Sequence, residues 1–276
     1  MEGCSVNVAN ICRDDRTEIL GVGVSSVNLD DAVARIERWI GERSRNYVCV
    51  TGVHGVMECQ RDQRLRSIHN DAGMVTPDGM PLVWFSRLTG RSHTQRVYGP
   101  DLMRKLTAVS NLRGYRQFYY GGTVGVTGKL THVLLRKYPQ LKVVGALCPP
   151  FRELTPEEDA AIVATVNAAR PDIVWVGLST PKQELWMARQ LGLIDAPVMI
   201  GVGAAFDFLA GTKRQAPRWM QRNGLEWLFR LCTEPRRLWR RYAYIVPGFL
   251  ILATGELVRR SLGFSNLAPP SLLDHK

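Results

Sequence analysis

Ile173-Val174-Trp175-Val176-Gly177 is an almost wholly apolar run with the length of a single β-strand. Such a run is expected of a parallel strand that helices cover on both faces. Similar apolar runs alternate with amphipathic stretches along most of the chain, from residue 19 to residue 201. This alternation predicts an α/β fold with a doubly wound, mainly parallel sheet.

The other predicted strands are apolar runs separated by stretches in which apolar residues recur with helical spacing. They are residues 19–24, 47–50, 73–75, 116–120, 141–145 and 197–201. From about Gly211 the alternation stops, and two helical stretches are expected near residues 224–233 and 235–260. The pattern divides the chain into a flexible N-terminus (1–16), an α/β domain (17–210), a helical appendage (211–263) and a tail (264–276).

Chain length and cysteine spacing indicate a globular protein without disulfides or a zinc site. A chain of 276 residues is long enough to bury a large core. Its six cysteines form no C-x-x-C pair and do not cluster with histidine, so we expect neither disulfides nor a zinc site. The N-terminus lacks the apolar core of a signal peptide, so the protein is expected to stay in the cytoplasm.

Positive charge is concentrated in the appendage. Residues 211–260 hold eleven Lys and Arg against three Glu, which is +8 of the net charge of +11. Such a segment fits nucleic acid, an anionic membrane surface or an ordinary solvated face. Here the basic residues are interleaved with Trp219, Trp227, Trp239, Tyr242 and Tyr244, a pattern that favours a membrane interface. The alternative is a helix packed on its own domain with exposed arginines.

Residues 244–257 form the most apolar part of the appendage. This stretch is interrupted by Pro247 and Glu256, and it is shorter than the ~20 residues that a membrane-spanning helix needs. We therefore expect it to lie at a membrane surface without crossing it.

A carboxylate stands at one strand-to-helix turn of the predicted sheet. Thr76-Pro77-Asp78-Gly79 follows a short apolar run and precedes a helix-like pattern through residue 88. Ligands of α/β proteins usually bind at such turns. Proline restricts this turn and glycine allows close approach of the backbone, so the Asp78 side chain has a fixed direction. The alternative is that Asp78 only forms the turn or caps the helix.

Two glycine-containing loops also follow predicted strands. Gly121-Gly122-Thr123-Val124-Gly125 joins a strand to a helix, where backbone N–H groups can bind phosphate. Neither this loop nor Gly201-Val202-Gly203 matches the Walker A or the G-x-G-x-x-G pattern. Glycine also simply ends strands, so these loops are weak evidence alone. The missing fingerprint disfavours a nucleotide-binding oxidoreductase on the same fold, which is the alternative function.

Thr180-Pro181-Lys182-Gln183-Glu184 follows the central predicted strand. Thr180 is expected to cap the next helix, with Pro181 in its first turn and Gln183 completing a capping box. Lys182 and Gln183 would also lie where a nucleotide could be bound. The chain contains no Asp-x-Asp sequence to hold a metal between phosphates. A leaving diphosphate would then need Arg, Lys or helix dipoles.

These motifs occur in an order that resembles the WecG/TagA/CpsF glycosyltransferase family, over about residues 18–245. The resemblance rests on Thr51, Thr76–Gly79, Arg96–Leu102, Tyr120–Gly122, Val176–Glu184, Gly201–Asp207, Ala216–Gln221 and Gly224–Leu231.

The resemblance implies a Rossmann-like catalytic domain and a membrane-associating appendage. It implies a UDP-sugar donor, such as UDP-N-acetylmannosamine, and a polyprenyl-diphosphate-linked saccharide acceptor at the cytoplasmic face of the inner membrane. Inversion without metal or other cofactor, for polysaccharide biosynthesis, is also implied. We expect no nucleic acid partner, and a homo-oligomer is one option for the quaternary state.

Residue roles follow from the same resemblance. Asp78 matches the general base of the family, Thr51 a residue that lines its pocket, and Gln183 a donor-site residue. The full set of predicted substrate-binding residues is Thr51, His54, Thr76, Arg96, Gly99, Asp101, Gly121, Gly122, Gly177, Lys182, Gln183, Glu184, Gly203 and Phe206. The predicted membrane- or acceptor-binding residues are Arg214, Arg218, Arg222, Arg236, Arg237, Arg240 and Arg241.

One stretch departs from the family pattern. The family often has Thr-x-Asn at the second strand end, whereas this chain has Thr51-Gly52-Val53 followed by His54. The missing amide leaves the identity of the sugar open. His54 could be a structural histidine or a catalytic one.

Overall fold

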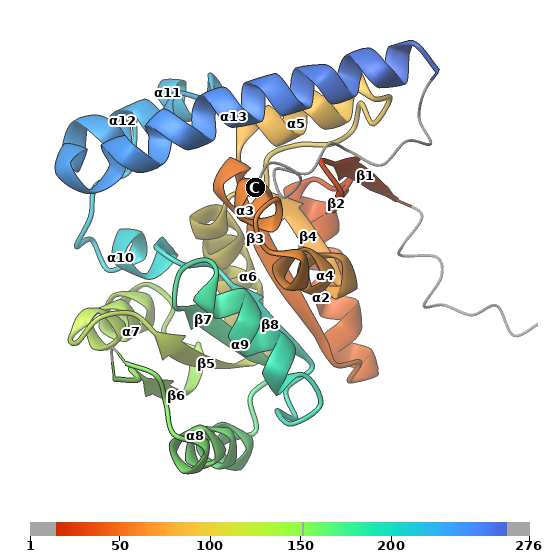
Figure 1. Ribbon diagram of the computed structural model, residues 1–276. Helices are drawn as coiled ribbons and strands as arrows, with labels where there is room; N and C mark the ends of the chain where they lie inside the picture. The colour runs from red at the N-terminus through yellow and green to blue at the C-terminus, as the bar shows by residue number, and fades with distance from the viewer. Residues whose placement is uncertain (1–14, 151, 264–276) are drawn as a thin grey trace, which may run out of the picture.

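The fold is built on a central sheet of parallel strands (Figure 1). The computed structural model describes residues 15–150 and 152–263, so the predicted tail 264–276 and nearly all of the predicted N-terminal segment 1–16 lie outside the described residues. The six strands stand in the order β4-β3-β8-β7-β5-β6. They are β3 (Asn46–Thr51), β4 (Met74–Pro77), β5 (Arg116–Gly121), β6 (Lys142–Leu147), β7 (Ile173–Gly177) and β8 (Val198–Gly201). Because all are parallel, their carboxyl ends share one edge of the sheet.

Helices cover both faces of this sheet, which confirms the predicted doubly wound α/β class. Successive residues of β7 alternate between two hydrophobic clusters, with Val174 and Val176 in one and Ile173 and Trp175 in the other. One face carries α2 (Leu29–Glu42), α6 (Gly99–Arg113), α7 (Val126–Lys137) and α10 (Ala205–Leu209). The other carries α3 (Val53–Cys59), α4 (Gln63–Asp71), α5 (Met80–Leu88), α8 (Pro156–Ala169) and α9 (Lys182–Gln190).

The first predicted strand, residues 19–24, is wrong. This region forms a hairpin of two antiparallel strands outside the main sheet, β1 (Arg16–Ile19) and β2 (Val22–Ser25). Between them Leu20 and Gly21 both have positive φ, 50° and 77°, as a tight two-residue hairpin turn requires. The glycine that we read as part of a strand therefore marks the turn.

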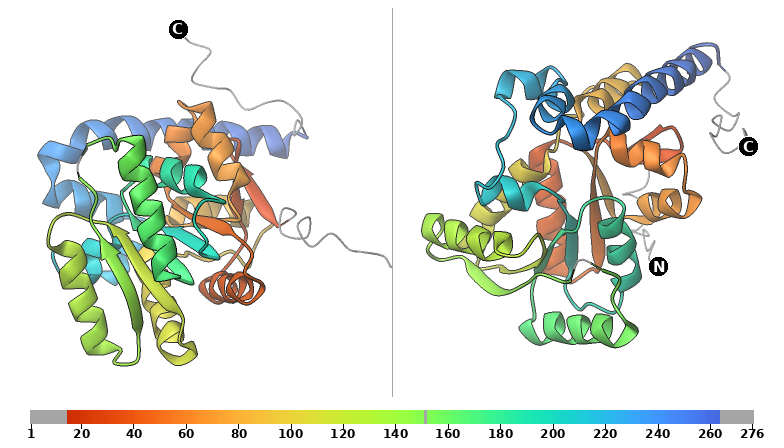
Figure 2. Two further views of the ribbon diagram at one scale, coloured as in Figure 1. Left: turned by 90° about the horizontal axis from the view of Figure 1, so that it is seen from below. Right: turned by 60° about the vertical axis from the view of Figure 1, so that its left-hand side comes forward.

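The C-terminal region forms three helices that follow the sheet. They are α11 (Arg218–Arg222), α12 (Glu226–Thr233) and α13 (Pro235–Ser261). The long α13 runs beside α3 and α5 at the top of the molecule (Figures 1 and 2). Its buried stripe of Ile245, Phe249 and Ala253 belongs to the same hydrophobic cluster as α3 and α5. The appendage is thus packed on the α/β domain.

A buried carboxylate fixes the C-terminal end of α13. Glu256 accepts a hydrogen bond from the Leu20 backbone N–H at 2.8 Å and pairs with Arg260. Arg260 also donates to the Glu18 carbonyl at 2.6 Å. Hydrogen bonds to a buried charge are among the stronger ones, so this contact ties α13 to the N-terminal hairpin. Over the described residues, no helix combines the length and the hydropathy of a membrane span.

Candidate functional site

The candidate site lies at the carboxyl end of β4, where the sequence places Asp78. The Asp78 backbone N–H donates to the Thr51 carbonyl at 2.9 Å, which joins the ends of β3 and β4. The next helix, α5, has Gly79 at its N-cap position and no side-chain cap, so Asp78 is not a capping residue. Its Oδ1 instead accepts from the Gly99 backbone N–H at 3.4 Å.

The second carboxylate oxygen of Asp78 faces a glycine. A Cβ atom added to Gly52 would lie 3.9 Å from Oδ2, so the glycine leaves room beside this oxygen. Burial raises the pKa of Asp78 to about 6, against the lowering effect of nearby Arg96 and the raising effect of Glu226. A carboxylate with this pKa is ionised at neutral pH and is a better proton acceptor than an ordinary Asp.

The C-terminal helices contact the Asp78 turn through one arginine. The Nε atom of Arg96 donates to the Asp78 carbonyl, and its guanidinium lies 4.1 Å from the Tyr98 ring centroid. The same guanidinium donates to Glu226 of α12 at 2.5 Å and to Gln221 of α11 at 3.2 Å. Tyr98 also donates to Glu226, at 3.3 Å. The appendage therefore forms one wall of the site.

Two buried threonines stand at the strand ends beside Asp78. The hydroxyls of Thr51 and Thr76 are buried and have no hydrogen-bond partner. A buried hydroxyl without a partner is costly, so such groups often mark a functional site. His54 lies 3.6 Å from Glu58, and its pKa is lowered to about 4 by burial and by Arg241 and Arg61. This histidine is a weaker base than Asp78 at neutral pH.

The glycines after β5 and β7 serve close packing. A Cβ atom on Gly121, whose φ is 112°, would lie 2.7 Å from the Gly177 carbonyl carbon. A Cβ atom on Gly177 would lie 2.8 Å from the Phe206 ring, and the Gly122 N–H donates to the Gly177 carbonyl at 2.9 Å. The Gly122 N–H is thus occupied within the protein. Binding of substrate by these residues stays a prediction.

The segment after β7 does not cap α9 as expected. Pro181 is the N-cap residue and makes no side-chain cap, whereas the Thr180 hydroxyl donates to Glu184 at 2.9 Å. The predicted capping box is wrong because the Thr180 side chain forms a hydrogen bond with the buried Glu184 carboxylate and not with the helix backbone. Gln183 is buried as well, and Lys182 is exposed.

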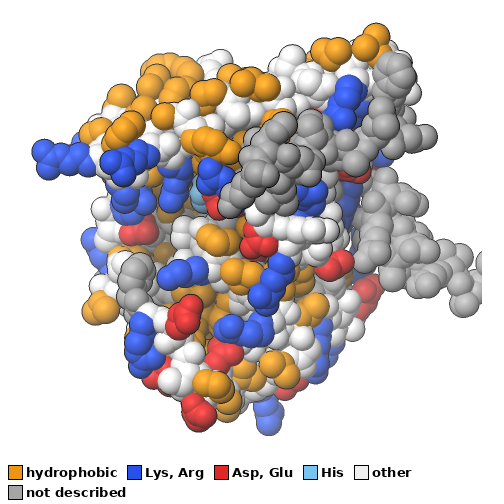
Figure 3. Space-filling view, viewed as in Figure 1, with side chains coloured by type: hydrophobic (Ala, Val, Ile, Leu, Met, Phe, Trp, Pro, Cys, Tyr) orange, Lys and Arg blue, Asp and Glu red, His pale blue; other side chains and the backbone are white. Residues whose placement is uncertain are grey.

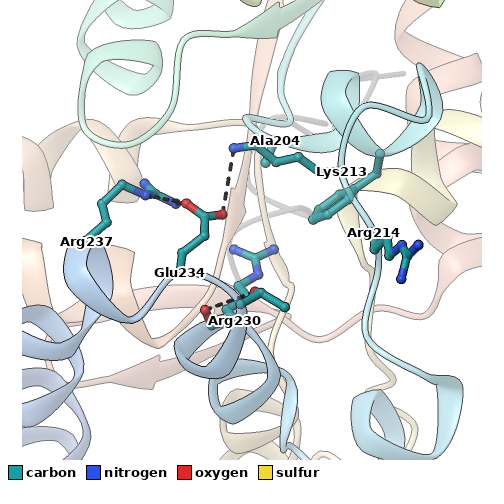
Figure 4. A pocket seen from close by; sticks show the side chains of 8 residues that line it. Ala204, Lys213, Arg214, Arg230, Glu234 and Arg237 are labelled. Atoms are coloured by element: carbon teal, nitrogen blue, oxygen red, sulfur yellow. Dashed lines mark hydrogen bonds and ion pairs between the residues drawn. The ribbon is translucent and has the colours of Figure 1, made fainter.

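A cationic pocket lies between α10 and the last helices. Its volume is about 250 Å³. It is lined by Ala204, Phe208, Lys213, Arg214, Arg230, Thr233, Glu234 and Arg237. Lys213 and Arg237 both pair with Glu234, at 4.0 and 2.5 Å (Figure 4). Four cations against one acid give this pocket the charge that binds phosphate.

Arg230 connects the pocket to the Asp78 turn. It pairs with Glu226 at 2.9 Å, and its guanidinium lies 5.4 Å from the Phe208 ring centroid. Its charge also lowers the pKa of Asp78, although less than Arg96 does. One ion-pair network, Arg96–Glu226–Arg230, therefore runs from the backbone of the Asp78 turn to the cationic pocket.

The sequence-predicted cations separate into two groups. Arg214 and Arg237 line the pocket, whereas the other predicted arginines do not. All seven are exposed: Arg214, Arg218, Arg222, Arg236, Arg237, Arg240 and Arg241. Asp101, which we expected at the site, forms an ion pair with Arg104 at 2.7 Å.

Sequence reasoning missed several residues of this site. They are Tyr98, Phe208, Lys213, Gln221, Glu226, Arg230 and Glu234. One signal was available for Glu226, which is the only acidic residue in the basic stretch from 211 to 233. Within the described residues, no three His, Cys, Asp or Glu side chains are grouped so as to hold a metal ion. Metal independence of the reaction stays a prediction.

Comparisons with known proteins identify the family of this chain. Residues 17–263 match the model of the glycosyl transferase WecG/TagA/CpsF family. An N-acetylglucosaminyldiphosphoundecaprenol N-acetyl-beta-D-mannosaminyltransferase from Bacillus subtilis is 30% identical over 66% of this chain and 68% of its own. The protein of that name from Staphylococcus aureus is 25% identical over 82% of this chain and 87% of its own.

The matched range includes the α/β domain, the Asp78 turn and the C-terminal helices that complete the site. The chain therefore belongs to the glycosyl transferase WecG/TagA/CpsF family and is a glycosyltransferase.

Proposed function

We propose that this enzyme transfers a sugar, N-acetylmannosamine or a related hexose or uronate, from a UDP-sugar to a polyprenyl-diphosphate-linked saccharide. The names of its relatives, which specify such a lipid-linked acceptor, support this choice. The reaction inverts the anomeric carbon, needs no metal and serves polysaccharide biosynthesis. The observation that carries the proposal is a carboxylate of raised pKa on a turn whose backbone Arg96 binds, together with the Arg96–Glu226–Arg230 ion pairs that lead from this turn to a cationic pocket.

Asp78 acts as the general base. The attacking sugar hydroxyl must lose a proton as its bond to the anomeric carbon forms, and a carboxylate within reach accepts it. Space beside Oδ2, left by Gly52, supports approach of the hydroxyl to this oxygen. Thr51 and Thr76, whose buried hydroxyls lack partners, position the reacting sugars.

The cationic pocket holds a diphosphate. Lys213, Arg214, Arg230 and Arg237 supply the positive charge that stabilises the departing UDP, the task that a divalent metal performs in many transferases. Arg230 connects this charge to the Asp78 turn. Nucleophile activation and leaving-group stabilisation then occur in adjacent parts of one site.

The acceptor lipid requires the site to face a bilayer. Hydrophobic side chains gather along the upper edge of the molecule, over the helices α5, α11, α12 and α13 (Figures 1 and 3). The exposed members are Trp84, Leu88, Trp219, Leu228, Trp239, Tyr244, Leu250, Ile251, Val258 and Leu262. Interleaved with the exposed arginines, they form a surface suited to the cytoplasmic face of the inner membrane. We infer peripheral binding there.

Donor and acceptor identity can be tested together. We expect UDP-N-acetylmannosamine or a related UDP-sugar to react with a synthetic prenyl-diphosphate N-acetylglucosamine, and we expect exhaustive EDTA treatment to leave the rate within about twofold, since cationic side chains replace the metal. Product is measured by mass spectrometry. Loss of activity in EDTA that Mg²⁺ or Mn²⁺ restores would refute the metal-independent mechanism.

The pKa of Asp78 sets the pH dependence. Because the base must be ionised, kcat/KM should rise with pH and reach half its maximum at about pH 6. An ordinary aspartate would already be ionised at pH 5. The check is kcat/KM between pH 5 and pH 8.5, with residual activity of Asp78→Asn as control. A wild-type profile that is flat over this range would exclude Asp78 as the base.

Membrane binding should depend on exposed apolar residues of α13. We expect Leu250→Glu combined with Ile251→Glu to weaken binding to phosphatidylglycerol-containing vesicles at least about tenfold. The reason is that two exposed aliphatic side chains can then no longer enter the bilayer. Leu112→Glu combined with Leu193→Glu adds the same two charges at exposed leucines outside α13, so it is the matched control and should bind as wild type. Vesicle co-sedimentation measures the affinity, and equal binding by all three proteins would assign the interface elsewhere.

A further inference from the structure

The first turn of α9 contains a carboxylate that cannot reach a ligand directly. The Glu184 side chain is completely buried, and Gln183 beside it is 2% exposed. One oxygen of Glu184, Oε1, accepts hydrogen bonds from the Thr180 hydroxyl and from the Gln183 amide, both at 2.9 Å. Its other oxygen, Oε2, is buried without a hydrogen-bond partner. Burying a carboxylate costs free energy, so its presence here needs an explanation.

The Gln183 amide connects this carboxylate to the loop after β8. Its Nε2 donates to Glu184, and its Oε1 accepts from the Gly203 backbone N–H at 3.0 Å. Because the carboxylate can only accept, it determines which end of the amide faces Gly203. The amide oxygen is thereby directed at the loop.

Two residues with left-handed backbone face each other where the amide contacts the Gly203 loop. Gly203 has a φ of 51° and Ser179, across from it, a φ of 67°. A Cβ atom on Gly203 would lie 3.8 Å from the Ser179 Cα. A non-glycine residue with left-handed φ persists only where its surroundings hold it. The Glu184–Gln183 pair provides such surroundings for both loops.

The next residues of the chain form the cationic pocket. Ala204 follows Gly203 and lines the pocket, as does Phe208 of α10. A shift of the Gly203 backbone would therefore move one side of the pocket. Phe206 of the same helix packs on Gly177 and Gly122, so the shift would also reach the ends of β5 and β7.

We propose that Glu184 is a positioning residue: through Gln183 it fixes the Gly203 loop and so shapes the cationic pocket for a nucleoside diphosphate. Glu184 itself is completely buried and acts on the loop only through Gln183. This inference rests on the proposed function, since it assumes that the pocket takes the diphosphate of UDP.

Calorimetric titration with UDP tests this role apart from catalysis. Glu184→Ala should weaken UDP binding at least about tenfold, because the Thr180 hydroxyl and the Gln183 amide both lose their acceptor and the loop loses its order. Glu184→Gln keeps an oxygen that accepts from Thr180 and Gln183, and it should bind UDP within about threefold of wild type. Glu184→Asp keeps the charge but moves the acceptor away from Thr180 and Gln183, so its UDP affinity should lie between those of the wild type and Glu184→Ala. This variant still tests the role if Glu184→Ala does not fold.

Glu256→Ala is the matched control for losing a buried carboxylate. Glu256 also accepts a backbone N–H, but it lies at the far end of α13. This variant should melt at a lower temperature and bind UDP as wild type. Wild-type UDP affinity in Glu184→Ala or Glu184→Asp, or equal weakening in Glu256→Ala, would overturn the inference. Failure of the wild-type protein to bind UDP would instead refute the proposed function.

Discussion

Replacing Asp78 with Asn is expected to lower turnover at least about 10²-fold while leaving UDP affinity almost unchanged. Asparagine keeps the shape and can still accept the Gly99 N–H through its oxygen, but it cannot accept a proton. The measurement is kcat at saturating donor and acceptor, with a thermal melt of the same sample.

The Asp78→Asn substitution should keep or raise the stability of the fold while it lowers turnover. The folded-state pKa of Asp78, about 6, lies above its usual value of 3.8. The ionised carboxylate therefore destabilises the folded state above about pH 6, and this cost disappears as the pH falls below 3.8. The shift corresponds to at most about 3 kcal/mol, and partial exposure of the side chain reduces it.

Asp78→Asn should consequently melt at the wild-type temperature or above it at pH 8. Asp101→Asn is the comparison, because Asp101 forms only an exposed pair with Arg104 and should change turnover little. A turn-forming role for Asp78 predicts the reverse result, a lower melting temperature and a loss of activity explained by unfolding.

Replacing Arg230 with Ala is expected to lower kcat/KM by about 10²- to 10³-fold, the usual effect of removing one group that stabilises charge in the transition state. Arg230 both lines the cationic pocket and pairs with Glu226, so its loss removes charge next to the leaving diphosphate. Lysine at this position should recover only part of the loss, because it is a point charge without the planar fork of arginine.

Arg136→Ala is the matched control for this experiment. Arg136 is an exposed arginine in the last turn of α7, so its removal changes the net charge equally and leaves the pocket intact. Steady-state kinetics with donor and acceptor varied in turn measure the effect. If Arg230→Ala keeps the wild-type kcat/KM, the pocket does not bind the leaving group.

The fold class could be predicted because strand and helix periodicity are local properties of the sequence. β7 and α5 occur where apolar spacing and the Pro77–Gly79 turn indicated. The hairpin was missed because Gly21, which forms the turn with Leu20, stands inside an apolar run that reads as one strand. Hydrophobic periodicity also could not tell that α13 packs on α3 and α5, since an amphipathic helix suits a core and a membrane equally.

Site residues could be predicted from the sequence only where a single local motif contains them. Asp78 stands between proline and glycine in a single turn, so its place was visible in the sequence. The ion pair between Arg96 and Glu226 joins residues 130 positions apart, and no local sequence pattern around either residue predicts that contact. Gln183 and Glu184 belong to a visible motif, yet their burial follows from how α9 packs against β8 and α4.

The central claim is a single displacement at the anomeric carbon with Asp78 as base, and the stereochemistry of the product tests it most directly. Proton NMR of the disaccharide formed from an α-linked UDP-sugar and the prenyl-diphosphate acceptor gives the anomeric configuration. Inversion predicts a β-linked product, the anomer that the names of its relatives specify. An α-linked product would require two displacements or a front-face reaction and would contradict the role assigned to Asp78.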